Sequence, residues 1–232
     1  MKGTIVVTGA ARGIGRVLAE KLAESGPFTV VGVDLSPELG LSEAIVPVQL
    51  DLTSESGPQQ VRETVEGLGL PLLGLVNNAG ITRDARLVNM TDADFSAVLE
   101  VNLGAAFKLT TELAPLMTEG AAVVNIASRA YLGNFGQFNY SMSKGGLVGM
   151  TRALAISLAP TVRVNAVAPG LIATEMSMAI PENIREKMVS AIPLERMGTP
   201  EEIANAVWFL ISPLSSYITG EVLVVGGGRS LT

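Results

Sequence analysis

The chain has 232 residues, 48% of them hydrophobic, and a formal net charge of −6. This length suits one large α/β domain, and no run of Lys or Arg offers a site for nucleic acid or an anionic membrane. There is no cysteine and no histidine, which excludes disulfides, thiol or histidine catalysis and ordinary zinc or copper sites, so we expect no metal. Acid–base chemistry must then use Tyr, Lys, Asp, Glu or water.

Seven short β-branched runs, each bounded by Gly, Asn or Asp, predict strands. They are apolar nearly throughout rather than alternating, which is typical of a parallel sheet buried on both faces. In chain order the predicted strands are 4–8, 28–34, 45–51, 73–77, 121–127, 162–168 and 222–225.

Helical patterns lie between these runs, with apolar residues at one-face spacing over 14–22 and 203–210. Thr91 and Thr199 are expected to begin helices, the second with a capping box and a proline at the first helical position. Between 34 and 45 a loop or one helical turn must suffice, because only about ten residues are available. The alternation predicts one doubly wound α/β domain of the Rossmann type over residues 1–232, with about seven parallel strands and helices on both faces.

A glycine-rich run from Thr8 to Gly15 directly follows the first predicted strand and opens the first helix. Its spacing, Gly9-x-x-x-Gly13-x-Gly15, differs from the general dinucleotide fingerprint. Glycines permit a tight turn and a close approach of the backbone, while the N–H groups and dipole of the new helix face a pyrophosphate. We therefore expect a dinucleotide phosphate site, a ligand-free glycine turn being the alternative.

Two residues bear on the choice of dinucleotide. Asp34 ends the second predicted strand, where a carboxylate would accept hydrogen bonds from the adenosine ribose and repel the 2′-phosphate of NADP(H). Arg12 favours the opposite choice, because a guanidinium could pair with that phosphate. We expect NAD(H) to be preferred and NADP(H) to be possible, with a plain turn aspartate as the alternative for Asp34.

A second constellation is the pair Tyr140 and Lys144, four positions apart in a segment whose apolar residues continue at helical spacing. An ammonium beside a phenol favours the phenolate and lowers its pKa. A shift of about three units requires roughly 4 kcal/mol, more than an exposed pair supplies, so the nicotinamide ring and burial of the site are expected to add the rest. Ser128, at the end of a predicted strand, could hydrogen-bond the substrate oxygen alongside Tyr140.

With these residues in place, the sequence resembles the short-chain dehydrogenase/reductase family over essentially its whole length. The elements that match are Thr8-Gly9 with Gly13-Ile14-Gly15, Asp51-Leu52, Asn77-Asn78-Ala79-Gly80, Asn102, Ser128, Tyr140, Lys144, and Pro169-Gly170 followed by Thr174.

The resemblance implies a role for each matching residue. Tyr140 is then the general acid in carbonyl reduction, Lys144 lowers its pKa and binds the nicotinamide ribose, Ser128 positions the carbonyl, and Asn102 holds a water in a proton relay. Asp51 meets the adenine amino group, Asn78 to Gly80 lie beside the adenosine and the central sheet, and Pro169 to Thr174 meet the carboxamide and the diphosphate. For Asn102 and for the Asn77 to Gly80 run, an ordinary helix polar residue and a strand-ending turn remain alternatives.

Together, the motifs and the resemblance place one set of residues at the cofactor. These are Gly9, Arg12, Gly13, Ile14, Gly15, Asp34, Asp51, Leu52, Asn78, Ala79, Gly80, Tyr140, Lys144, Pro169, Gly170, Ile172 and Thr174.

Within the family, segments 78–84, 168–174 and 217–220 look closest to the bacterial 3-oxoacyl-(acyl-carrier-protein) reductases. Members that dock the acidic carrier protein look basic just before the strand that carries the serine, whereas this chain has Glu119 there. The turn at 159–161 is uncharged, with only Arg163 behind it, and Asp34 conflicts with the commoner NADPH preference.

The expected activity is therefore NAD(H)-dependent interconversion of a 3-oxoacyl thioester, linked to acyl carrier protein or CoA, and its 3-hydroxyacyl form. One alternative is a dehydrogenase of a small secondary alcohol, polyol or sugar. An alternative of another class is a catalytically idle dinucleotide-binding or redox-sensing subunit, although that would not require Ser128, Tyr140 and Lys144 together. A sugar epimerase would need a larger C-terminal substrate domain.

The segment Leu171 to Met197 holds four of the nine methionines and is expected to be a substrate lid, whose methionines line an adaptable acyl pocket or fill an ordinary core. By resemblance we expect a homotetramer or homodimer, with Gly145, Gly146 and Gly149 allowing close helix approach. The segment 217–232 is expected to contribute a subunit interface as well as the last strand. With no signal segment and no long apolar run, the chain is expected to be cytoplasmic, with neither nucleic acid nor membrane as partner.

Overall fold

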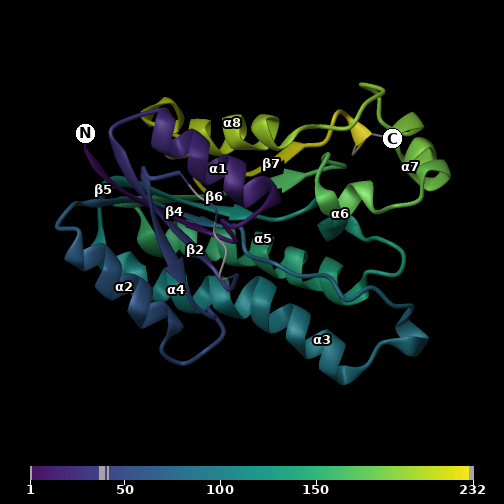
Figure 1. The fold of residues 1–232 in the computed structure, drawn as a ribbon, viewed down its shortest axis with the longest axis horizontal. Coiled ribbons are helices and arrows are strands. Elements are labelled where there is room, and N and C mark those ends of the chain that lie inside the picture. The colour runs from purple at the N-terminus through teal and green to yellow at the C-terminus, as the bar shows by residue number, and fades with distance from the viewer. Residues whose placement is uncertain (1, 37–39, 41, 230–232) are drawn as a thin grey trace.

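A computed structural model of the protein describes residues 2–36, 40 and 42–229 (Figure 1). Its centre is a sheet of seven parallel strands in the order β3-β2-β1-β4-β5-β6-β7. The doubly wound parallel sheet predicted from the sequence is confirmed, and its order reverses between β1 and β4, where such sheets bind ligands. The strands are β1 Gly3–Thr8, β2 Phe28–Asp34, β3 Ile45–Gln49, β4 Leu72–Asn77, β5 Met117–Ile126, β6 Val162–Pro169 and β7 Val222–Val225.

Helices cover both faces of the sheet (Figure 1). In the picture, α1 and α8 lie above it, α2, α4 and α5 lie below it, and α6 and α7 lie on the right, beyond the carboxyl ends of the strands. The helices are α1 Gly13–Glu24, α2 Gly57–Gly67, α3 Asp92–Leu99, α4 Ala105–Leu113, α5 Phe138–Leu158, α6 Glu175–Met178, α7 Glu182–Ser190 and α8 Pro200–Ile211.

Each face of the sheet has its own apolar core, because successive strand residues point to opposite faces. Val7 belongs to the cluster that contains Leu18 of α1 and Ile203 of α8. Its neighbour Val6 belongs to the cluster with Val61 of α2 and the buried side chains of α4. This double burial explains why the strands read as continuous apolar runs.

Two strands differ from their predicted bounds by more than one residue. β3 stops at Gln49 instead of residue 51, because the Asp51 carboxylate accepts hydrogen bonds from the Thr53 N–H at 2.8 Å and its hydroxyl at 2.7 Å, which turns the chain. β5 begins at Met117, four residues early, and its pairing with β4 changes register before Gly74. No helix lies in the described part of 35–44, as expected for a loop.

Both predicted helix starts are confirmed. The Thr91 hydroxyl accepts a hydrogen bond from the Asp94 N–H at 3.0 Å and caps α3. Thr199 and Glu202 form the expected capping box of α8. Within the described ranges, no helix is both long and apolar enough to cross a membrane.

Arg163 lies near the amino end of β6, part-buried beneath the end of α8. Its guanidinium donates hydrogen bonds to the Ser215 hydroxyl at 2.8 Å and to the carbonyl oxygens of Ile211, Ser212 and Ile218 at 3.3, 3.3 and 3.4 Å. Burial lowers the pKa of Arg163. The side chain that the sequence left as a possible docking cation is thus committed to joining β6 to the turn after α8.

A ladder of buried amides and hydroxyls joins the two central strands to the helices below them. The Asn77 amide donates to the Thr110 hydroxyl of α4 at 3.0 Å and to Asn125 Oδ1 at 2.8 Å. The Asn125 amide donates to the Thr151 hydroxyl of α5 at 2.9 Å. Because buried polar groups are directional when paired, this ladder fixes α5, which carries Tyr140 and Lys144, against the sheet.

Candidate active site

The glycine-rich turn lies at the carboxyl end of β1 and requires glycine on geometric grounds. Gly9 and Gly13 have φ of 67° and 55°, the left-handed region that side chains disfavour. A Cβ at Gly9 would lie 2.8 Å from Asn78 Nδ2, and one at Gly15 would collide with the Gly9 carbonyl oxygen. The sequence therefore uses glycine for both conformation and close packing.

Asn78, expected beside the adenosine and the sheet, braces this turn. Its amide donates to the carbonyl oxygens of Thr8 at 2.9 Å and Gly9 at 3.2 Å. In return, the Thr8 hydroxyl accepts from the backbone N–H groups of Asn78 and Ala79, each at 3.0 Å. The ends of β1 and β4, which flank the switch point of the sheet, are thereby fixed to each other.

The start of α1 fits the phosphates of a dinucleotide. Arg12 precedes the helix in extended conformation, and no side chain of the described residues caps the first turn. The N–H groups in the first turn of α1 can therefore bind an anion. A Cβ at Gly13 would lie 3.9 Å from Thr174 Cγ2, so the predicted diphosphate residues of the glycine turn and of the segment after β6 do face each other.

Asp34 also holds the glycine turn, a role that the sequence did not reveal. Oδ2 accepts the Ala11 N–H at 2.9 Å, and Oδ1 accepts the Ser36 N–H at 3.0 Å. Each oxygen keeps a lone pair that a ribose hydroxyl could use. Arg12, the residue after Ala11, is exposed. Asp51, two residues beyond β3, is also exposed, whereas Leu52 is buried.

Ser128, Tyr140 and Lys144 come together at the carboxyl end of β5. Ser128 caps a short 3₁₀ helix, η4 (Arg129–Leu132), and its hydroxyl lies close enough to Tyr140, in the first turn of α5, to affect the pKa of that phenol. Lys144 lies one turn further along α5. Its Nζ is 5.6 Å from the centroid of the Tyr140 ring and donates to the Ile126 carbonyl oxygen at 2.8 Å. The structure thus brings together the three residues that the sequence singled out.

Burial dominates the electrostatics of this cluster. It raises the pKa of Tyr140, an effect that the Ser128 hydrogen bond opposes and Asp84 reinforces. Burial also lowers the pKa of Lys144 from 10.5 to about 8. Our expectation that burial would help lower the pKa of Tyr140 is wrong, because a low-dielectric surrounding penalises the charged phenolate.

Asn102 lies in a π-helical turn, Glu100–Gly104, between α3 and α4. Its Oδ1 accepts the Ile81 N–H at 2.8 Å, and its amide donates to the Ile81 carbonyl at 3.1 Å and to Ser143 Oγ at 3.0 Å. A Cβ at Gly80 would lie 3.2 Å from Asn102 Oδ1 and 3.5 Å from Lys144 Nζ. Asn102 therefore borders the site, and a π turn of this kind often marks a functional position.

Sequence reasoning missed two partners in this arrangement, Ser143 and Ile81. The Ser143 hydroxyl donates to the Tyr140 carbonyl at 2.8 Å while it accepts from Asn102. The i,i+3 spacing from Tyr140 was the available signal for Ser143. Nothing local in the sequence marks Ile81, since only its backbone takes part.

The segment from Leu171 to Met197 lies between β6 and α8 and includes α6 and α7. Its two ends meet, because Ile172 pairs with Gly198 in an isolated bridge. At its start, the Gly170 N–H donates to Val225 O at 2.9 Å, which places Pro169 and Gly170 against the end of β7. At its finish, Arg196 pairs with Glu202 of α8 and lowers the pKa of Glu202 to about 2.

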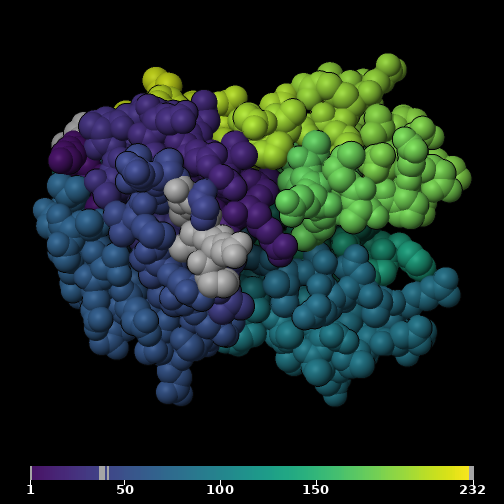
Figure 2. Space-filling view, viewed as in Figure 1, coloured from purple at the N-terminus to yellow at the C-terminus, as the bar shows by residue number. Residues whose placement is uncertain are grey.

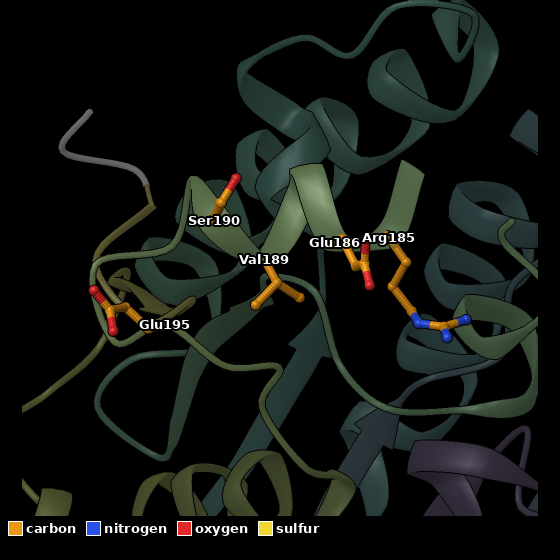
Figure 3. Close-up of a pocket in the computed structure, with 5 residues that line it drawn as sticks. All are labelled: Arg185, Glu186, Val189, Ser190 and Glu195. Carbon is orange, nitrogen blue, oxygen red and sulfur yellow. The ribbon is translucent and has the colours of Figure 1, made fainter. Parts of the chain in front are cut away.

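Figure 2 shows the surface hollowed between the green segment that contains α6 and α7 and the blue-teal region of α3. A separate cavity of about 410 Å³ lies against α7 and is lined by Arg185, Glu186, Val189, Ser190 and Glu195 (Figure 3). None of the predicted site residues lines this second cavity, and its charged rim does not match an acyl or nicotinamide pocket.

The fold and the site together define a class of protein, a dinucleotide-dependent oxidoreductase built on a doubly wound sheet. A family model described as enoyl-(acyl carrier protein) reductase matches residues 9–230. The chain is 44% identical to the 3-oxoacyl-(acyl-carrier-protein) reductase FabG of Aquifex aeolicus, over 96% of this chain and 95% of that protein. It is 46% identical to the acetoacetyl-CoA reductase of Synechocystis sp., over 97% and 95% of the two chains.

Solved structures agree with this class. The chain is similar to a short-chain dehydrogenase/reductase from Brucella melitensis titled glucose/ribitol dehydrogenase, with 37% identity, a TM-score of 0.91 and coverage of 98% of this chain and 96% of that chain. The protein belongs to the short-chain dehydrogenase/reductase family. It is an oxidoreductase that binds a nicotinamide dinucleotide, so the predicted family and enzyme class are confirmed.

Proposed function

We propose that the protein is an NAD(H)-dependent oxidoreductase that interconverts a 3-oxoacyl thioester and its 3-hydroxyacyl form. The observation that carries this proposal is the cluster of Ser128, Tyr140 and Lys144 beside a glycine turn shaped for a dinucleotide. Support for the acyl substrate comes from the relatives named 3-oxoacyl-(acyl-carrier-protein) reductase and acetoacetyl-CoA reductase.

In the reducing direction, the bound cofactor supplies a hydride to C3 of the substrate. As the C3–O double bond opens, Tyr140 gives its phenolic proton to the oxygen, and Ser128 donates a hydrogen bond to the same oxygen. The resulting phenolate regains a proton from water, for which Asn102 is the proposed relay residue. Lys144 stabilises the phenolate, because an ammonium keeps donors beyond the one that binds Ile126.

The preference for NAD(H) rests on Asp34. A carboxylate already fixed by two backbone N–H groups is pre-organised to accept the ribose hydroxyls and to repel a 2′-phosphate. The other cofactor residues are proposed on the glycine turn, at Asp51 and Leu52, on the Asn78 to Gly80 run, and on the segment from Pro169 to Thr174.

Exposed apolar side chains near the site favour an acyl substrate. Met176 and Met178 of α6 are 62% and 54% exposed on the proposed lid. Leu132 and Phe135, which follow Ser128 in the chain, are 57% and 86% exposed. Apolar surface on both segments suits an acyl chain and a pantetheine arm better than a polyol.

The carrier is proposed to be CoA at least as readily as the acyl carrier protein. An acidic carrier protein requires exposed cations, but Glu119 lies among the exposed first residues of β5 and Arg163 is engaged by four oxygens of the fold.

A homodimer or homotetramer is proposed from the outer face of α5. Met142 and Ile156 are 46% and 82% exposed there, and a Cβ at Gly145 or Gly149 would meet nothing within 4 Å. A second interface is proposed at the edge strand β7 and the preceding turn, where Tyr217 is fully exposed. Residues 230–232 of this predicted interface lie outside the described residues. Light scattering at micromolar concentration tests both, and a monomer would contradict them.

The main competitor is a dehydrogenase of a sugar or polyol, favoured by the structures titled glucose/ribitol dehydrogenase and putative gluconate dehydrogenase. A cofactor-matched screen of acetoacetyl-CoA, acetoacetyl carrier protein and a sugar and polyol panel separates the two. We expect NADH-dependent turnover of a thioester. Turnover of a polyol alone would overturn the acyl proposal, and NADH binding without any turnover would favour an idle or sensing subunit.

A further inference from the structure

Arg129 occupies a position that the proposed chemistry does not use, directly after Ser128. It begins η4, whose backbone is firmly held: the Ala130 N–H donates to Ser128 Oγ at 3.1 Å, and the Tyr131 N–H donates to the Ser128 carbonyl at 2.9 Å. Tyr131 packs against a buried cluster of Ala127, Val148 of α5, and Ala166 and Ala168 of β6. The guanidinium of Arg129 therefore extends from a fixed point one residue away from the hydroxyl that meets the substrate carbonyl.

The charge of Arg129 has no counterpart in the part of the chain that the structure describes. Its Nε is buried and has no hydrogen-bond acceptor. None of the ion pairs among the described residues includes Arg129. A buried N–H of a guanidinium without an acceptor is unfavourable, and such a group is often explained by a ligand or ion that binds there.

A second cation lies beside it. Arg229 is in the turn after β7, and β7 is separated from β5 by β6 alone. Burial lowers the pKa of Arg229, and the charge of Arg129 lowers it further. The like charges of the two guanidinium groups therefore repel each other, and an anion bound to Arg129 would relieve that repulsion.

The cofactor phosphates are proposed to bind elsewhere, at the start of α1 after β1. Arg129 instead follows β5, two strand positions from β1, and Arg229 follows β7, four positions from β1. The phosphate of a pantetheine arm is also remote, because the whole arm separates it from the thioester. The anion must lie on the acyl part of the substrate, close to the reacting carbonyl.

We propose that Arg129 binds a carboxylate on the acyl part of the substrate, so that the protein favours 3-oxoacyl thioesters with a second, unesterified carboxylate. This subsite deepens the proposed function and rests on it. A planar guanidinium binds a carboxylate through two parallel hydrogen bonds, which would also fix the position of C3 beneath Ser128 and Tyr140.

Two N-acetylcysteamine thioesters, 3-oxoadipyl and 3-oxohexanoyl, test the proposal. They have the same number of acyl carbons, differ in a terminal carboxylate against a methyl, and lack the carrier phosphate. We expect the unmodified enzyme to favour 3-oxoadipyl by at least about tenfold in kcat/KM. Arg129→Met should remove that preference and change 3-oxohexanoyl less than about threefold, while Arg129→Lys keeps part of it. Lys21→Met, which removes a distant cation on α1, should leave both values unchanged.

The outcomes separate the subsite from the proposed function. Equal use of both substrates, or an equal loss on both in a folded Arg129→Met, overturns the subsite and leaves the function standing. If Arg129→Met lowers kcat/KM only when the neutral acyl chain is attached to CoA, the arginine binds the carrier phosphate and the proposal is wrong. If neither thioester is reduced by protein that binds NADH, the proposed function fails and the subsite fails with it. Should Arg129→Met not fold, stronger inhibition of the unmodified enzyme by adipate than by hexanoate supports the subsite, and equal inhibition overturns it.

Discussion

Two buried or part-buried cations lie near opposite ends of two neighbouring strands, β5 and β6. They differ in how many of their hydrogen-bond donors the fold satisfies. Arg163, near the amino end of β6, donates to four oxygens from the end of α8 and the turn after it. Lys144, at the carboxyl end of β5, donates to Ile126 O alone among the described residues, although it is only 3% exposed. Neither belongs to an ion pair within the described ranges.

The difference indicates that Arg163 stabilises the fold, whereas Lys144 takes part in the proposed reaction. Arg163 is satisfied by the fold, so its removal should cost stability and little else. Lys144 is buried at a cost in desolvation and keeps unused donors beside Tyr140, which the fold alone does not explain. Substitution of Lys144 should therefore lower activity without lowering stability, and substitution of Arg163 should lower stability without lowering activity.

The largest separation is expected at Lys144. Lys144→Met should lower turnover by at least about 100-fold, because the phenolate of Tyr140 loses the charge that stabilises it. The free energy of unfolding at pH 7 should not fall, since a buried charge is replaced by an apolar chain of similar length. Steady-state kinetics and urea denaturation measure the two effects, with Lys21→Met as the control. A loss of stability with intact turnover would reverse the assignment.

Arg163→Met should show the opposite behaviour. The carbonyls of Ile211, Ser212 and Ile218 lose their shared donor, and the free energy of unfolding should fall by about 1–3 kcal/mol. Turnover per folded molecule should stay within a few-fold of the unmodified protein, because the side chain lies at the far end of the strands. A large loss of turnover in a fully folded Arg163→Met would break the comparison.

Asp34 combines a structural and a functional role, because it braces the glycine turn and is proposed to select the cofactor. NADH should exceed NADPH in kcat/KM by at least about tenfold, or roughly 1.4 kcal/mol. Asp34→Asn keeps an acceptor for the Ala11 N–H and should reduce the preference mainly by improving NADPH. Adding Arg12→Ala should remove that improvement. An unmodified enzyme that prefers NADPH would make Arg12 the dominant specificity residue.

The smallest effect is a pH dependence of stability. Burial lowers the pKa of Lys144 from 10.5 to about 8 in the folded protein. Between these values the unfolded chain holds a proton that the folded protein has lost, so the free energy of unfolding rises with pH, on the order of 1 kcal/mol per unit. This contribution is lost as the pH falls through about 8. Denaturation between about pH 7.5 and 9.5, below the range where Tyr140 titrates, should show it in the unmodified protein and not in Lys144→Met.

The fold was predictable because its signals are local and mutually consistent. Continuous apolar runs gave the buried parallel strands, and the capping residues Thr91 and Thr199 marked helix starts that the structure confirms. Errors fell at strand ends such as residues 50 and 51, where a side chain hydrogen bond redirected the backbone. Long-range pairing decides such ends, and a sequence pattern does not contain it.

The sequence predicted that Ser128, Tyr140 and Lys144 lie together, but not how the residues of the candidate site contact one another. Spacing along one helix placed Tyr140 beside Lys144, and the glycine turn was readable from its position after a strand. The bracing of that turn by Asp34 and Asn78, the engagement of Arg163, and the unsatisfied Nε of Arg129 depend on residues far apart in the chain. The direction of the Tyr140 pKa was missed because burial, the largest cause of the shift, is a property of the folded state, and because Asp84, which raises this pKa further, is distant in the sequence.

The most direct test of the central claim is the turnover of Tyr140→Phe with NADH and a 3-oxoacyl thioester. The ring still packs beside Lys144, but the proton donor is gone, so turnover should fall by at least about 100-fold while NADH affinity stays within a few-fold. Fluorescence titration of NADH and circular dichroism establish that the variant binds and folds. Near-normal turnover in such protein would remove Tyr140 from the mechanism and contradict the account of this site.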